Sequence, residues 1–249
     1  MEHGIKNSIS AFVDDVMKSG MSGFYREIWG RVANFDELPL VSRNDFLKVP
    51  LSKRRYKDEK ALVKIVHTPE GPFLSEWSFD DIGQEPWGVP SKRPMVYLED
   101  SHEALEKSMW CYENNMVPLI GERDADIAMF AAGKYRIDQL ITDTASLPKL
   151  LPYLKRRGEK LMSLTVLGDS FDAPTLMPFS DFARTVRFVL RLPEVGAIAE
   201  APLADKPVFR TVPNTFVESE DGTLVVTKLT RLITPVIRYR TDIRDITVV

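Results

Sequence analysis

The side chains best suited to metal or nucleophilic chemistry are three histidines and one cysteine. His3, His67 and His102 have no second histidine four residues away, which is the spacing of a helical metal site. A metal centre built on histidine is therefore not expected. Cys111 lies in a predicted helix between two aromatic residues, where a buried structural thiol is expected rather than a nucleophile. A single cysteine also excludes an intrachain disulfide and a multi-cysteine zinc site.

Two motifs of common enzyme classes are absent from the sequence. A nucleophile elbow requires Gly-x-Ser-x-Gly at a strand-to-helix turn, and no such segment occurs. The classical phosphate loop Gly-x-x-x-x-Gly-Lys-Ser/Thr is also missing. Hydrolases of the nucleophile-elbow type and nucleotidases with this phosphate loop are therefore excluded.

The most informative segments lie near the C-terminus. Residues 221–231 read Asp-Gly-Thr-Leu-Val-Val-Thr-Lys-Leu-Thr-Arg, and residues 235–242 read Pro-Val-Ile-Arg-Tyr-Arg-Thr-Asp. They resemble a paired motif of the phenylacetate–CoA ligase branch of adenylate-forming enzymes, Gly-Glu-Leu-Val-Leu-Thr-Thr-Leu-Thr-Arg and Pro-Leu-Ile-Arg-Tyr-Arg-Thr-Gly-Asp. The resemblance implies a shortened large N-terminal domain of that superfamily. It also implies that a small carboxylic acid reacts with ATP, with Mg²⁺ as cofactor, to an acyl-adenylate that is passed to a thiol.

The same resemblance implies nucleotide contacts at four positions, in addition to the phosphate contacts described below. Asp242 corresponds to the residue that hydrogen-bonds the ribose, with Arg240 beside it. Because the glycine of the family motif is missing before Asp242, Asp245 is the alternative. Gly168 and Asp169 correspond to a strand-end turn beside the acyl substrate and the adenine. Taken by itself, Arg240 is expected as an exposed arginine of a strand next to a packed tyrosine rather than as a ligand contact.

The magnesium ligand implied by the resemblance is Glu194. It lies in Leu-Pro-Glu-Val-Gly at residues 192–196, which is similar to the family signature Tyr-Gly-x-Thr-Glu. Of the functional side chains in that signature, only the glutamate is present in this sequence. A surface or helix-start carboxylate is the alternative interpretation of Glu194.

The phosphate loop of the family, Thr-Ser-Gly-Thr-Thr-Gly-Lys-Pro, corresponds to a shorter segment here. Residues 67–73 read His-Thr-Pro-Glu-Gly-Pro-Phe, so Thr68 and Gly71 are the candidate phosphate contacts. The lysine and most hydroxyls are missing, and Glu70 adds a negative charge that repels phosphates. This segment is the strongest argument against efficient use of ATP.

Three functional hypotheses follow, and none names a catalytic residue. The family's lid domain, which carries its catalytic lysine, would lie beyond Val249, so an active ligase is expected to need a companion chain that bears a lid. The alternative is a non-catalytic relative that binds a nucleotide, an acyl group or a partner protein. The third hypothesis is an interaction protein without a small-molecule site.

The elements that must position these residues are predicted from periodicity. An amphipathic helix is expected at residues 5–17, and Ser42, Asp100 and Ser146 are expected to cap further helices. Apolar strand-like runs occur at residues 62–66, 95–98, 127–130 and 161–167, followed by short β-prone pieces at 207–212, 215–218, 223–227 and 236–239. The alternation predicts an α/β fold with a layered, mostly parallel sheet and a small β-rich subdomain. The expected segments are a helical arm at 1–60, an α/β core at 61–204 and the β-rich subdomain at 205–249.

Composition excludes several other classes. Lys and Arg total 33 against 36 Asp and Glu, a formal net charge of -3, so a nucleic-acid partner is not expected. No secretory start and no apolar run long enough to span a membrane occur, so a cytoplasmic protein without a membrane partner is expected. The basic clusters at residues 53–55 and 155–157 are interpreted as solvated faces, with phosphate binding as the alternative.

Overall fold

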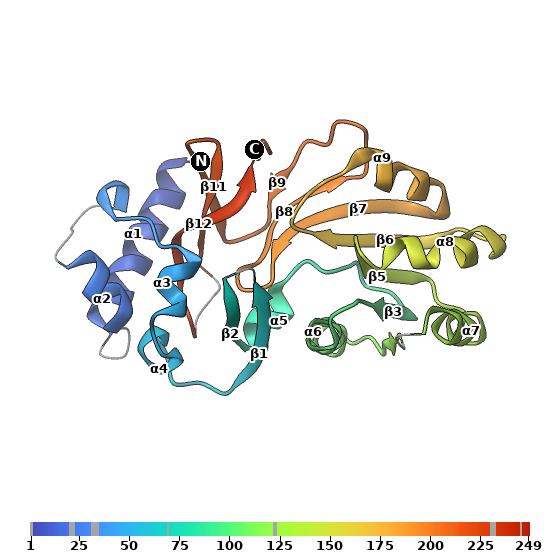
Figure 1. The fold of residues 1–249 in the computed structure, drawn as a ribbon, viewed down its shortest axis with the longest axis horizontal. Coiled ribbons are helices and arrows are strands. Elements are labelled where there is room, and N and C mark those ends of the chain that lie inside the picture. The colour runs from blue at the N-terminus through green and yellow to red at the C-terminus, as the bar shows by residue number, and fades with distance from the viewer. Residues whose placement is uncertain are drawn as a thin grey trace. The chain divides into compact units, whose positions relative to one another are not determined.

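The chain forms two compact units in a computed structural model (Figure 1). The structure describes residues 2–19, 23–30, 35–68, 70–121, 124–229, 233–244 and 246–249. The first unit comprises Met1–Asp81 and Pro213–Ile246, and the second comprises Ile82–Val212 and Thr247–Val249. Both units are built from discontinuous stretches, and the three consecutive segments expected from the sequence stay a prediction.

The first unit begins with short helices packed through aromatic side chains. They are α1 (Glu2–Lys18), α2 (Gly23–Trp29), the 3-10 helix η1 (Phe35–Glu37), α3 (Arg43–Leu47) and α4 (Leu51–Arg54). The helix expected at residues 5–17 is thus confirmed. Ser42 caps α3 as expected: its side chain accepts a hydrogen bond from the backbone N–H of Asp45, and the Asp45 carboxylate accepts one from the backbone N–H of Ser42. Phe46 of α3 stacks on Phe24 and Tyr239 at ring-centroid distances of 4.9 and 5.6 Å.

Two antiparallel sheets complete the first unit. One is the hairpin of β1 (Ala61–Thr68) and β2 (Gly71–Ser78). The other joins β10 (Thr215–Glu220), β11 (Thr223–Lys228) and β12 (Val236–Arg244) in that order. Asp221 and Gly222 turn the chain between β10 and β11 with φ values of 52° and 72°, the two left-handed residues of a type I′ hairpin turn. Asp-Gly is a typical sequence for this kind of turn, which joins the β-prone pieces expected at 215–218 and 223–227.

The second unit is built around a seven-stranded sheet with the order β4-β3-β5-β6-β7-β8-β9. The parallel strands are β3 (Pro94–Tyr97), β4 (Leu119–Ile120), β5 (Gln139–Asp143), β6 (Leu161–Gly168) and β7 (Ala183–Leu192). The antiparallel strands are β8 (Gly196–Pro202) and β9 (Arg210–Thr211). This mostly parallel sheet, together with the antiparallel sheets of the first unit, confirms the expected α/β fold class.

Helices and 3-10 turns connect these strands, as Figure 1 shows. They are α5 (Phe79–Gln84), α6 (Ser101–Glu113), α7 (Ala125–Tyr135), α8 (Leu147–Arg156), α9 (Ala173–Leu176) and the 3-10 helix η2 (Met177–Phe182). Asp100 caps α6 as expected, because its carboxylate accepts hydrogen bonds from the backbone of His102 and Glu103. None of the helices in the described residues combines the length and the apolar character needed to cross a lipid bilayer.

Three local expectations were wrong. Residues 127–130 lie in α7 and not in a strand, since a short apolar run has no periodicity of its own and the cap at Asp124 decides for a helix. Ser146 makes no side-chain cap on α8, because its backbone N–H binds the Asp143 carboxylate at 2.6 Å. Arg54 does not belong to a solvated face: it is 3% exposed and lies over the ring of Phe73.

Candidate functional site

The candidate residues divide between the two units. Thr68, Gly71, Arg240 and Asp242 belong to the first unit, and Gly168, Asp169 and Glu194 belong to the second. The alternative residue Asp245, and with it Pro69, Thr230 and Arg231 of the two motifs, lies outside the described residues. Each unit assembles its own set of candidates.

The segment that corresponds to the phosphate loop is the tight turn between β1 and β2. Thr68 and Gly71 face each other across this turn, and the Thr68 hydroxyl donates a hydrogen bond to the Gly71 carbonyl at 2.7 Å. Gly71 has a φ of 131°, which a residue with a side chain rarely adopts. The hydroxyl that the sequence offered to a phosphate is thus engaged within the turn itself.

Arg43 joins this turn to the predicted ribose-binding residue. Its Nη1 atom lies 3.2 Å from Oε2 of Glu70 and 2.8 Å from Oδ2 of Asp242. The Arg43 side chain is 12% exposed, whereas Asp242 is 74% exposed and keeps its other oxygen accessible to solvent. A backbone hydrogen bond at Glu70 and the Arg43 guanidinium together lower the pKa of the Glu70 carboxyl. Glu70 is therefore an anion in the turn whose sequence corresponds to the phosphate loop of the family.

Arg43 is a candidate site residue that sequence reasoning missed. The capping box around Ser42 was a signal that places Arg43 in the first turn of a helix. Its two partners are 27 and 199 residues away in the chain, however, so no local pattern pointed to them.

Arg240 and Asp242 share one face of β12. Along this strand the side chains of Tyr239 and Thr241 are buried, and those of Arg240 and Asp242 are exposed, as strand alternation requires. The backbone of Arg240 donates to the carbonyl of Val41 at 2.8 Å, which fixes the strand against the segment before α3. The exposed arginine next to a packed tyrosine matches the structural alternative, and the exposed face leaves a ligand contact open.

In the second unit, Gly168 and Asp169 lie at the carboxyl edge of the sheet, where β3, β5, β6 and β7 end. A Cβ atom on Gly168 would lie 2.8 Å from Cζ of Phe188 and 2.9 Å from Cγ2 of Thr144, so no side chain fits there. Asp169 follows the strand and is exposed. The carboxyl edge therefore carries an accessible carboxylate directly after a position where any side chain would force its neighbours to move.

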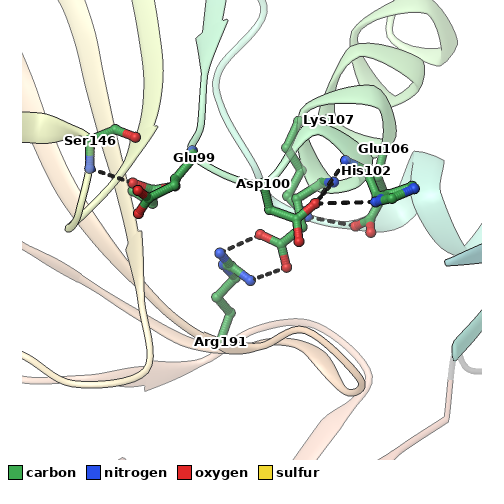
Figure 2. Close-up of polar contacts among 9 residues, drawn as sticks. Glu99, Asp100, His102, Glu106, Lys107, Ser146 and Arg191 are labelled. Carbon is green, nitrogen blue, oxygen red and sulfur yellow. Dashed lines mark hydrogen bonds and ion pairs between the residues drawn. The ribbon is translucent and has the colours of Figure 1, made fainter. Parts of the chain in front are cut away.

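The strand order reverses at the carboxyl ends of β3 and β5, which is where open α/β sheets bind ligands. Figure 2 shows the polar side chains at this point. The Asp143 carboxylate accepts hydrogen bonds from the backbone of Glu99 at 2.9 Å and of Ser146 at 2.6 Å. The Asp100 carboxylate is similarly engaged by the first turn of α6. These carboxylates therefore hold the loops in place.

Below these loops lie two buried ion pairs, both shown in Figure 2. Arg191 of β7 binds the carboxylate of Glu103 through both terminal nitrogens, with Nη1 at 2.5 Å from Oε1. Glu106 accepts from Lys107 at 2.6 Å, and the Lys107 ammonium also lies 3.7 Å from the centre of the Trp87 ring. Because each charge has an opposite charge beside it, the burial of these groups is compatible with a stable fold.

Glu194 lies in the turn between β7 and β8 and is 4% exposed. It is thus not the surface carboxylate of the alternative interpretation. In the described ranges of the chain, no three His, Cys, Asp or Glu side chains gather in a way that could hold a metal ion. A cage of several protein ligands for a metal ion is therefore not found around Glu194 in this part of the chain.

Cys111 of α6 is completely buried, and burial raises the pKa of its thiol to about 12. A thiol with this pKa stays protonated at neutral pH and is a poor nucleophile. The structural role expected from the sequence is confirmed by this burial.

Comparison with known proteins identifies solved structures with a similar fold. The sequence matches no protein-family model and no curated protein. The structure matches the N-terminal subdomain of Klebsiella oxytoca NpsA in complex with 3-hydroxybenzoyl-AMSN, with a TM-score of 0.56, 12% identity, and 73% of this chain and 59% of that chain covered. It also matches wild-type E. coli MenE with a bound analogue of OSB-AMS, with a TM-score of 0.53, 11% identity, and 72% and 44% covered.

A third match is the acyl-CoA synthetase (AMP-forming)/AMP-acid ligase II-like protein of Dyadobacter fermentans. Its TM-score is 0.53 at 15% identity, with 74% of this chain and 58% of that chain covered. The chain spans about half the length of these matched structures. The two units therefore contain the α/β fold found in the N-terminal part of adenylate-forming ligases.

Proposed function

We propose that the chain is a non-catalytic relative of adenylate-forming ligases that binds an AMP-type ligand or an acyl-adenylate and does not turn over ATP. The ligand class is suggested by the fold shared with proteins bound to acyl-adenosine analogues. The absence of turnover is suggested by the turn between β1 and β2. This turn corresponds to the segment with which the family binds a triphosphate. Here it contains the carboxylate of Glu70, and its Thr68 hydroxyl is bonded to the Gly71 carbonyl.

Asp242 is the residue proposed to bind the ribose. Its Oδ2 atom is bound by Arg43, which holds the carboxylate in one orientation, and its high exposure leaves Oδ1 for a hydroxyl donor. Arg240 on the same face of β12 is proposed to meet the single phosphate of the ligand. One phosphate carries less negative charge than three and needs fewer cations beside it. A single phosphate is therefore consistent with a turn between β1 and β2 that contains the anion Glu70.

Taken by itself, the second unit offers Gly168 and Asp169 as proposed contacts for an acyl or adenine group. The closely packed glycine lets the backbone of the strand end come near a ligand, and the exposed carboxylate offers an acceptor to an amino or hydroxyl group. Glu194 is proposed to act without a metal, through the shape of the turn between β7 and β8.

The test is calorimetry of the full chain with AMP, ATP and a hydrolysis-resistant acyl-sulfamoyl adenosine, combined with an assay of pyrophosphate release. AMP and the sulfamoyl compound should bind, and no pyrophosphate should form with any carboxylic acid. Asp242→Ala should weaken AMP binding by about 1–3 kcal/mol because a charge-assisted hydrogen bond to the ribose is lost. Glu37→Ala, which removes an exposed carboxylate elsewhere in the same unit, is the matched control and should bind AMP like the wild type.

Pyrophosphate release by the purified chain would overturn the proposal and favour the second candidate, an AMP-forming acid–thiol ligase. The similarity of residues 235–242 to the phenylacetate–CoA ligase branch favours this candidate and suggests aromatic acids as the first substrates to assay. Release that requires an added lid-bearing protein would support the companion-chain version of the enzyme. Binding of none of these compounds would favour an interaction protein without a small-molecule site.

A further inference from the structure

A large pocket lies at the amino edge of the parallel sheet, where β3, β5, β6 and β7 begin. Its volume is about 820 Å³, and all the residues described around it belong to the second unit. The predicted candidate residues of this unit lie at the opposite, carboxyl edge, so the pocket is separate from them. Five basic side chains line it: Arg93, Arg136, Arg157, Lys160 and Arg184.

The pocket has an excess of positive charge. Among its described lining residues, the acidic ones are Asp138 and Glu159. The Asp138 carboxylate accepts a hydrogen bond from the backbone N–H of Arg93 at 3.1 Å, which fixes the start of β3 against β5. The Arg157 guanidinium donates to the backbone carbonyls of Ile137 and Glu159. In the described part of the second unit, no ion pair joins any of the five cations to a carboxylate.

Helix ends account for only some of these cations. Arg136 caps the C-terminus of α7, and Arg157 caps that of α8, where a positive charge complements the partial negative charge of the helix end. Arg93, Lys160 and Arg184 have no such role, because they lie at the beginnings of β3, β6 and β7. Three positive charges thus converge on the pocket without a structural reason in this part of the fold.

We propose that this amino-edge pocket binds a multiply phosphorylated small molecule. Arginine recognises phosphate through paired hydrogen bonds, and several cations on one concave surface select a ligand with several anionic groups. The volume lies within the range of about 300–1,000 Å³ that is typical of pockets for small ligands. The net charge of -3 for the whole chain argues against a nucleic acid as the occupant. Tyr153 and Met162 also line the pocket and offer a surface for the organic part of the ligand.

The test is calorimetric titration of the full chain with inorganic triphosphate at two salt concentrations. The wild type should bind triphosphate, and binding should weaken as salt screens the cations. The variant Lys160→Gln/Arg184→Gln should lose on the order of tenfold in affinity for each cation removed. Both side chains are exposed, so this variant should fold as the wild type does.

The matched control is Lys92→Gln/Lys155→Gln, which removes two exposed cations from the same unit outside the pocket. It should bind triphosphate with the affinity of the wild type. Equal losses in both double variants would overturn the proposal, because the binding would then reflect overall charge only. Absence of triphosphate binding by the wild type would overturn it too. Citrate that binds as tightly as triphosphate would overturn the assignment to phosphate.

This pocket does not depend on the proposed function. AMP binding that is lost in Asp242→Ala but kept in Lys160→Gln/Arg184→Gln would separate the two sites. Triphosphate binding with the opposite pattern would complete the separation and support the amino-edge proposal. Loss of triphosphate binding in Asp242→Ala alone would overturn it.

Discussion

The two edges of the parallel sheet both gather charged side chains but differ in how these charges are neutralised. At the carboxyl edge, Glu103 pairs with Arg191 and Glu106 pairs with Lys107, inside the protein. At the amino edge, basic side chains line a pocket without a carboxylate partner in the described second unit. Charges that neutralise each other support the fold, whereas charges without a protein partner are available to a ligand.

The largest expected effect comes from breaking an ion pair of the carboxyl edge. Glu103→Ala should destabilise the protein by about 3–5 kcal/mol, because the Arg191 guanidinium stays buried after the carboxylate that neutralises it has been removed. Urea denaturation followed by circular dichroism measures this change.

The double variant Glu103→Ala/Arg191→Met is the control for this prediction. It removes both charges and should recover much of the lost stability, since no unneutralised charge remains buried. A loss below about 1 kcal/mol in the single variant would mean that the carboxyl-edge charges do not support the fold, and the contrast between the edges would disappear.

A smaller effect is expected from the closely packed end of β6. Gly168→Ala should cost about 1–3 kcal/mol, because the added methyl group would lie within 3 Å of the side chains of Phe188 and Thr144. The free energy of unfolding from urea denaturation measures it. An unchanged free energy of unfolding would show that the neighbours of Gly168 can move to make room for a methyl group. It would argue against a close approach of the backbone at Gly168 to a ligand.

The corresponding glycine of the amino edge should respond in the opposite direction. Gly133 lies in α7 and lines the basic pocket, and a Cβ atom there would meet nothing within 4 Å. Gly133→Ala should therefore stabilise the protein by about 0.5–1 kcal/mol through helix propensity. A destabilisation measured by the same urea titration would contradict the open geometry of the pocket.

The smallest effect is expected for the pocket cations themselves. Lys160→Gln/Arg184→Gln should change the free energy of unfolding by less than about 0.5 kcal/mol, because both side chains are exposed and pair with no carboxylate in the described unit. Thermal unfolding without ligand checks this. A loss above about 1 kcal/mol would assign these cations to the stability of the fold and remove the difference between the two edges.

The sequence selected candidate residues, whose roles stay a prediction, and it did not predict their surroundings. Its similarity to a family motif selected Asp242, and the residue types of the turn at residues 67–73 argued against phosphate binding. The contact of Arg43 with Glu70 and Asp242 was not predictable, because the three residues come from separate elements of the chain. The strand expected at 127–130 failed for a related reason, since a short apolar run is compatible with either kind of element.

By itself, the sequence determined what depends on neighbours along the chain: the capping box at Ser42, the hairpin turn at Asp221 and Gly222, and the α/β alternation. Only the tertiary structure decided which charges meet. Arg157 belonged to a basic cluster that could be a solvated face, and folding placed it with Arg93 and Arg184 at one edge of the sheet. Parallel strands begin at the same edge however far apart they lie in sequence, so convergence of charge is a property of topology.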